Sequence, residues 1–169
     1  AQSVRFMPDT GTRHMIDTIA SFELEERLVA QKQVLGDFDP IHPSTSLLAD
    51  ASGDNGNGTL FDWSAGHLTV NAGQALAKLR LQACQVDGRV LRGDSYVYPF
   101  TAGTKFTLKE HFRDELNTAH VLRRVQHSAR DELYRNSFEA FPANVPFRPP
   151  LLTPRPRGAG SAAADGGGP

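Results

Sequence analysis

Three histidines in the second half of the chain are the first residues that could support chemistry. His111, His120 and His127 are separated by nine and seven residues. On a helix the spacing of nine places His111 and His120 on opposite faces, and on a strand His120 and His127 point to opposite faces. No cysteine or carboxylate falls at the spacing of a zinc site. We therefore predict no metal centre and interpret these histidines as solvated or loop residues.

The stretch 50–58, DASGDNGNG, imitates the start of a calcium-binding loop. Asp50, Ser52 and Asp54 stand where the first ligands would be. The sixth position is Asn rather than Gly, and Phe61 stands where the bidentate Glu belongs. The stretch also lacks the glycine spacing of a phosphate-binding loop. We interpret it as a flexible, turn-rich loop.

Groups that could serve as nucleophiles or as acids and bases have ordinary explanations as well. The chain has no GxSxG elbow. Cys84 follows Ala83 within a helical pattern, which is typical of a small core or boundary thiol. A charged, solvent-facing surface explains the three glutamates Glu23, Glu25 and Glu26. We predict that the protein is not an enzyme, has no catalytic or metal-binding residues and needs no cofactor.

Composition limits the classes of protein further. The 169 residues suit one domain plus a tail, and 39% hydrophobic with 22% charged residues is typical of a soluble globular chain. Eighteen Lys and Arg against 19 Asp and Glu give a net charge of −1, which does not favour binding to nucleic acid or an anionic membrane. No apolar run spans a bilayer, and the first residues are not a signal peptide.

Residues 16–38 permit two interpretations. Ile16, Ile19, Leu24 and Leu28 fit a helical stripe. Six apolar residues instead occupy even-numbered positions, which would place them on one face of a long half-buried strand. They are Phe22, Leu24, Leu28, Ala30, Val34 and Phe38. The family resemblance described below favours the strand, which prolines 40 and 43 would end.

The clearest helix is expected near residues 72–87. Asn71 offers an N-cap side chain, and Gln74 stands three residues later as in a capping box. Gly88 is a natural stop. The apolar stripe that we expect to pack on the rest of the domain consists of Leu76, Leu79, Ala83 and Val86.

The pattern on both sides of this helix favours strands. Leu60 to Trp63 is a short strand or an aromatic anchor, and His111 to Asn117 is a loop. Phe106 and Leu108 share one face of a return strand. The strands expected after the helix are Val90 to Phe100, Lys105 to Leu108 after a turn at 101–104, His120 to His127 and Leu133 to Phe141. We predict a mainly β (α+β) fold, an antiparallel barrel-like domain with one packed helix.

A proline-spaced arm follows the last strand. Residues 142–157 can neither pair as a central strand nor continue a helix, and they carry Arg but no Asp or Glu. We divide the chain into a β domain at 1–141, a linker at 142–157 and a disordered Gly/Ala-rich tail at 158–169. Val145 and Phe147 are expected to pack back on the domain.

Three blocks of sequence resemble the hub region of VgrG proteins, the tip or spike proteins of type VI secretion systems, and the related late control D-like hubs of contractile phage tails. The first block is Phe22 to Asp39, a strand pair ending in D-[YF]-D. The second, Gly73 to Ala83, resembles the helix motif G-[EQ]-x-L-A-x-x-R-L-[EQ]-A. The third, Thr101 to Pro150, matches in register over many positions. Together they cover roughly Val4 to Arg157.

Some positions depart from the family pattern. Ala102 replaces the first residue of a Pro-Gly pair, Phe112 replaces a proline, and residues 61–66 replace an aromatic-Pro-Gly element. The first half of the hub is missing, and the tail stands where an OB-fold would begin. We therefore expect the second half of a hub rather than a complete spike.

The resemblance implies a structural role and particular structural residues. VgrG-like hubs form a homotrimer in the full-length context, cap the Hcp-like hexameric tube, continue into an OB-fold and needle, and can carry effector proteins. Such a protein assembles in the bacterial cytoplasm and is then secreted or injected. Residues that match the family motif are Gly103, Phe106, His111, Asn117, His127, Tyr134, Asn136, Phe138, Glu139, Pro146, Phe147, Arg148 and Pro149.

Two other classes of function remain open at this point. The first is a small peptidoglycan-active or other hydrolase of the effector type. The second is a stand-alone adaptor that recruits a partner through its proline-rich tail, where residues 146–149 form a PxxP spacing.

Overall fold

The computed structural model describes residues 2–9, 17–130 and 133–153. The elements are β1 (Gln2–Phe6), β2 (Thr18–Glu26), β3 (Lys32–Gly36), β4 (Ala49–Ser52), β5 (Thr59–Trp63), α1 (Val70–Val86), β6 (Arg89–Ser95), β7 (Lys105–Lys109), the 3-10 turn η1 (Asp114–Leu116), β8 (Ala119–Arg130) and β9 (Leu133–Pro142). The predicted fold class, mainly β with one packed helix, is confirmed.

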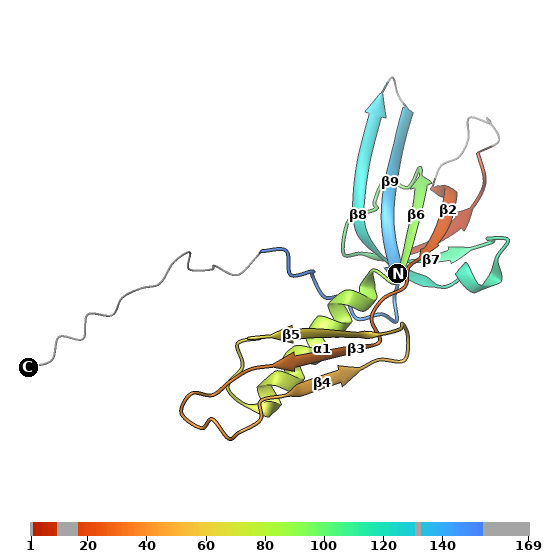
Figure 1. The fold of residues 1–169 in the computed structure, drawn as a ribbon. Coiled ribbons are helices and arrows are strands. Elements are labelled where there is room, and N and C mark those ends of the chain that lie inside the picture. The colour runs from red at the N-terminus through yellow and green to blue at the C-terminus, as the bar shows by residue number, and fades with distance from the viewer. Residues whose placement is uncertain (1, 10–16, 131–132, 154–169) are drawn as a thin grey trace, which may run out of the picture.

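Six strands close into a barrel in the order β1-β2-β6-β9-β8-β7 (Figure 1). β2, β6, β9 and β8 are joined by antiparallel pairings. The short N-terminal strand β1 closes the barrel by running parallel to both β2 and β7. Closure removes the free edges only where β1 and β7 reach, because both are shorter than the strands that they flank.

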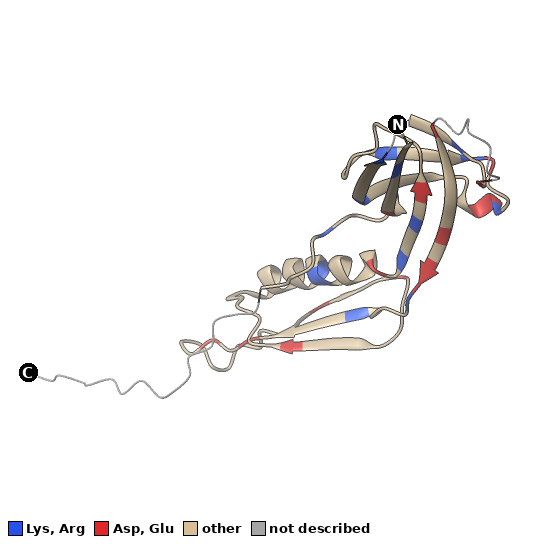
Figure 2. Cartoon of the chain, turned by 90° about the horizontal axis from the view of Figure 1, so that it is seen from above, with Lys and Arg blue, Asp and Glu red and all other residues tan. Residues whose placement is uncertain are grey.

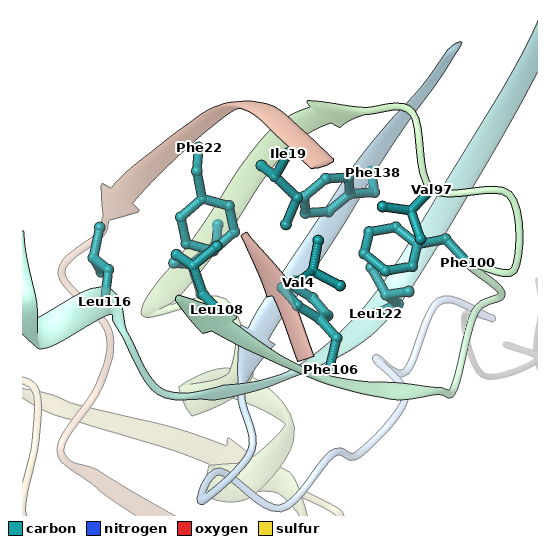
Figure 3. Close-up of a cluster of buried hydrophobic side chains, with 12 residues drawn as sticks. Val4, Ile19, Phe22, Val97, Phe100, Phe106, Leu108, Leu116, Leu122 and Phe138 are labelled. Atoms are coloured by element: carbon teal, nitrogen blue, oxygen red, sulfur yellow. The ribbon is translucent and has the colours of Figure 1, made fainter. Parts of the chain in front are cut away.

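The barrel interior is filled by alternate residues of its strands, as the period of two requires. Phe22, Phe106 and Phe138 meet one another there at ring-centroid distances of 5.8–6.3 Å. Figure 3 shows them pointing inward from different strands together with Val4 and Leu108. The prediction that Phe106 and Leu108 share one face of a strand is confirmed, because both side chains are fully buried in the barrel.

A second unit lies beside the barrel (Figure 1). It consists of the three-stranded sheet β4-β3-β5 with α1 packed on one face. The small core between them contains Leu35, Ala65 and Ala77. β5 confirms the strand interpretation of residues 60–63.

The helix begins earlier than predicted and buries another face. Thr69, not Asn71, is the N-cap, and its Oγ1 accepts a hydrogen bond from the Ala72 N–H at 3.2 Å. The fully buried positions on α1 are Gly73, Ala77, Leu81 and Val86. The assignment of Leu79 to the packed stripe is therefore wrong, since that side chain is 44% exposed. Val86 is buried and Leu76 packs against the small core, as predicted. Small residues face the sheet because the helix approaches it closely.

Residues 16–38 do not form one long strand. The chain leaves the barrel after β2, turns, and enters the second sheet as β3. Backbone bonds from Gln31 N–H to the Gly58 carbonyl and from Asn57 N–H to the Val29 carbonyl hold the turn. Leu28 is consequently 81% exposed, although its parity predicted burial.

Two further strand predictions have different outcomes. The hairpin of His120 to His127 with Leu133 to Phe141 is confirmed as β8 and β9. The strands on either side of the turn at 101–104 do not pair with each other, because β6 pairs with β2 and β9 while β7 pairs with β1 and β8.

The loop predicted at residues 50–58 is shorter than expected. Residues 49–52 form β4, and only 53–58 remain a loop.

The arm after β9 returns along the helix. Phe147 stacks on Phe141 at a ring-centroid distance of 5.5 Å, and Arg148 Nε donates to Gln82 Oε1 of α1 at 3.0 Å. The arm therefore contacts both units. The predicted tail at 158–169 lies outside the described residues.

Candidate assembly surfaces

The outer face of the barrel sheet carries a row of alternating charges. Strand register places Glu23 of β2 beside Arg92 of β6, Arg92 beside Glu139 of β9, and Glu139 beside Arg124 of β8. Arg92 forms ion pairs with Glu139 at 3.5 Å and with Glu25 at 2.6 Å. Figure 2 shows acidic positions along β2 and basic positions along β6.

The strands at the two ends of this row have open edges. β1 pairs with β2 only at Thr18 and Ile19. Beyond Ile19, the edge of β2 that faces β1 has no strand partner among the described residues. β7 pairs with β8 at residues 119–121, and the turn before it bonds to Leu122. From Arg123 onward β8 pairs only with β9 among the described residues. Open strand edges of this kind are available for pairing with another chain.

A buried polar network holds the β8–β9 hairpin against the loop after β6. Asn136 is 1% exposed, and its Oδ1 accepts from Ser95 Oγ at 2.7 Å. Its Nδ2 donates to the Val97 carbonyl at 2.9 Å and to Tyr134 Oη at 3.0 Å. Tyr134 Oη lies 2.5 Å from His127 Nδ1. Three motif residues from the sequence thus form one connected network that fixes the hairpin.

Two other motif residues fix the loop between β7 and β8. Asn117 Oδ1 accepts from the His111 N–H at 2.8 Å, while its Nδ2 donates to the His111 carbonyl at 2.9 Å. The His111 ring lies between Phe6 and Phe112, with ring centroids 4.4 and 4.2 Å away. Gly103 (φ +86°) makes the turn before β7. These contacts give the motif residues a structural explanation.

The interpretation of the histidines as solvated or loop residues is wrong for His120, which is buried on β8, whereas His111 does lie in a loop, although its side chain is buried. His111 and His120 are buried, and both rings contact Phe22 of the barrel core. His120 Nε2 lies 2.9 Å from the Leu116 carbonyl. Burial lowers the pKa of His120, which favours the neutral ring. Only His127 is exposed, because it lies where the hairpin extends beyond the barrel.

The sheet of the second unit has an uncovered apolar face. Phe61 and Trp63 lie side by side on edge strand β5, with centroids 6.4 Å apart and ring planes at 24°. Each is more than half exposed. Trp63 lies over Gly36, where an added Cβ would come 2.4 Å from the indole ring. Leu48 adjoins this site and is also exposed.

The D-[YF]-D motif secures the connections around this sheet. Asp37 accepts backbone hydrogen bonds from Phe38, Gly66 and His67. The bond from Phe38 is the largest cause that lowers the pKa of Asp37. Asp39 accepts from the Ile41 N–H at 2.9 Å. The two aspartates therefore shape loops, which is a structural use of carboxylates.

The remaining candidates for chemistry are dispersed. Within the described residues no three His, Cys, Asp or Glu side chains gather closely enough to hold a metal ion. Asp50 forms an ion pair with Lys32 at 3.0 Å instead of entering a calcium loop. Cys84 is half-buried on α1. In the part of the chain that the structure describes, no helix is long and apolar enough to cross a membrane.

The candidate residues serve packing and loop geometry within a mainly β fold. The sequence model of the phage tail baseplate hub (GPD) matches residues 1–133. The chain belongs to this family. Proteins of the family are structural components of the tail and not enzymes, so the prediction of a non-enzymatic tail hub is confirmed by family membership.

Solved tail proteins share the fold. The 43 kDa tail protein of prophage MuSo2 from Shewanella oneidensis is similar with a TM-score of 0.58 and 10% identity, over 80% of this chain and 45% of that one. A tail protein from Neisseria meningitidis MC58 gives a TM-score of 0.59 and 12% identity, over 85% and 44%. A chain in the virion of a gene transfer agent gives 0.51 and 12%, over 86% and 32%. No curated protein matches the sequence.

The chain therefore spans less than half the length of these structural relatives. The family match ends at residue 133, just before the Tyr134 to Pro150 part of the third sequence block. The charge row across four strands and the Trp63 contact with Gly36 were not found from sequence. The row depends on the register of strands that are distant in the chain, so local patterns carry no signal for it.

Proposed function

We propose that this chain is the part of a tip hub that joins a tail tube to its spike in a contractile injection machine, either a type VI secretion system or a related phage tail. Family membership supports the tail hub role. The three sequence blocks that resemble VgrG hubs support the finer assignment. In this role the chain acts within a homotrimer, contacts an Hcp-like hexameric tube protein and continues toward an OB-fold and needle supplied by the rest of the assembly.

The observation that carries this proposal is the pair of open strand edges on an otherwise closed barrel. A barrel that functioned alone would gain from covering these edges. A barrel that functions inside an assembly can use them for contacts with neighbouring subunits.

Purified particles and the isolated chain together test the proposal. We expect mass spectrometry to find the chain in tail or sheath particles from the producing bacterium, at a small number of copies relative to the tube protein. We also expect size-exclusion chromatography with light scattering to show a larger species when the tube protein is added. Absence of the chain from intact particles would refute the hub role.

The single tryptophan offers a second readout of the same binding. Because Trp63 is 57% exposed, a protein surface that covers it should shift its emission to shorter wavelength. Trp63→Phe provides the matched control, because it should remove the signal while keeping an aromatic ring.

A further inference from the structure

The second unit has an edge strand that is not protected against pairing. β5 lies at the outer side of the sheet β4-β3-β5 (Figure 1), and no strand in the described part of the chain pairs with its other side. Its sequence, TLFDW, contains neither proline nor lysine, and its register with β3 has no bulge. The one charged residue, Asp62, forms an ion pair with Arg80 of α1. An edge of this kind favours pairing with a further strand.

The surfaces on both sides of this edge are apolar. On the face away from α1, Phe61 and Trp63 are 59% and 57% exposed, and the Trp63 ring is held in place over a glycine of β3. On the face toward α1, a cleft of about 400 Å³ lies between β5, the helix and the C-terminal arm. Its apolar walls include Leu60, Cys84 and Leu151. A strand added to β5 would place alternate side chains in the cleft and the others beside the two aromatic rings.

The charged groups around the cleft already have partners. Asp62 pairs with Arg80, and Asp87 pairs with Arg123 of β8. A charged side chain that entered the cleft would have to break one of these pairs, whereas an uncharged side chain leaves both intact. The matched charges therefore identify the occupant as an uncharged, apolar segment.

Two occupants that belong to this chain itself fit the cleft less well. A second β5 paired in antiparallel fashion about Phe61 would bring another Asp62 carboxylate to a site whose arginine is already paired. The sequence that follows Thr153 includes Pro154 and Pro156, which lack the N–H group that a strand ladder needs. An uncharged strand from a different protein satisfies both the edge and the cleft.

We propose that the free edge of β5 accepts an extended, uncharged strand of a partner protein, which becomes the fourth strand of the sheet β4-β3-β5. Backbone hydrogen bonds to residues 59–63 supply affinity. Leu60 on one face, and Phe61 and Trp63 on the other, select apolar side chains. The inference goes beyond the hub role, because it rests on this edge and its cleft alone.

A synthetic peptide tests the proposal on the full chain. The probe is a capped peptide in which Val and Thr alternate between two terminal lysines, which extend past the ends of β5. We expect calorimetry to show saturable binding and the Trp63 emission to shift to shorter wavelength as the peptide covers the indole. The matched control peptide carries Pro in place of the central Val. It should bind about tenfold more weakly or worse, because it lacks a ladder N–H.

A substitution at the edge and an exchange measurement locate the binding. Phe61→Lys places a charge on the edge and should weaken binding of the Val/Thr peptide about tenfold. Leu133→Lys, at an exposed leucine of β9, is the matched control and should leave the affinity within about twofold of wild type. Bound peptide should also slow hydrogen exchange at alternate amides of β5, because alternate N–H groups of a strand face the same edge.

Several outcomes would overturn the proposal. One is the absence of saturable binding at peptide concentrations up to about 1 mM. Another is equal affinity for the proline peptide, which would mean that side chains dock without strand pairing. A third is short-wavelength Trp63 emission in the free chain. That emission would assign the groove to a second copy if it moves to longer wavelength on dilution, and to the chain's own tail if it does not.

Discussion

Gly73 of α1 lies directly against Ala49 of β4. A Cβ added at Gly73 would come 2.7 Å from the Ala49 Cβ and 2.6 Å from the His67 ring. His67 is itself buried, with Nε2 2.7 Å from the Leu47 carbonyl. The helix and the sheet are therefore separated by the width of a glycine at this point.

Gly73→Ala should destabilise the protein by about 1–3 kcal/mol, because the added methyl group overpacks the interface. This outcome opposes helix propensity, which favours Ala over Gly by about 1 kcal/mol in a helix interior. Urea unfolding followed by circular dichroism measures the difference. Gln74→Ala, an exposed neighbour on the same helix, is the control and should stay within about 0.5 kcal/mol of wild type. A more stable Gly73→Ala variant would show that the helix can move away from the sheet.

Two leucines on α1 should respond differently to the same substitution. Leu81 is buried against the sheet, and Leu79 is 44% exposed. Leu81→Ala should cost about 2–5 kcal/mol, because it leaves a cavity. Leu79→Ala should cost less than about 1 kcal/mol. The same unfolding experiment compares them, and equal losses would mean that the buried face of the helix is misassigned.

These two leucines also show how far sequence could lead. The existence of the helix followed from its composition, but its orientation did not. Hydropathy weights Leu79 heavily and gives Gly73 and Ala77 little weight, whereas close packing selects the small residues. The physical reason is that contact distance, not hydrophobicity, decides which face of this helix meets the sheet.

The barrel shows the same limit over longer distances. Alternation correctly predicted β7, β8 and β9, because one face of each strand is buried. It could not show that β1 closes the barrel against β7, a strand about a hundred residues away. It also joined β2 and β3 into one strand, because the turn between them is held by backbone bonds to the loop before β5. The opposed edges of the charge row depend on these same pairings.

The buried His120 should make stability depend on pH. Burial lowers the pKa of its imidazole below the ordinary value of 6.5, so the unfolded chain takes up a proton at a higher pH than the folded one. The contribution is fully present above about pH 6.5 and is lost as the pH falls toward the folded-state pKa. The urea midpoint of unfolding should therefore be lower at pH 5.5 than at pH 7.5.

His120→Gln isolates this effect, because glutamine can still donate to the Leu116 carbonyl but does not titrate. Its urea midpoint should change less between the two pH values than that of wild type. His127→Gln, at an exposed position, should retain the wild-type pH dependence. An unchanged dependence in His120→Gln would assign the effect to other groups.

The C-terminal arm should contribute to the stability of the domain through Phe147. Its ring stacks on Phe141 at the end of β9, and the adjacent Arg148 bonds to Gln82 on α1, so this segment links the barrel to the helix. Phe147→Ala should cost about 1 kcal/mol, less than a core phenylalanine, because 43% of the side chain is already exposed. Leu152→Ala, at a position that is 83% exposed, is the matched control and should have no measurable effect.

Hydrogen exchange gives a more specific test of the link. Phe147→Ala should raise the exchange rate of amides at the C-terminal end of α1 as well as in β9. Faster exchange in β9 alone would mean that the arm packs on the barrel without linking it to the helix.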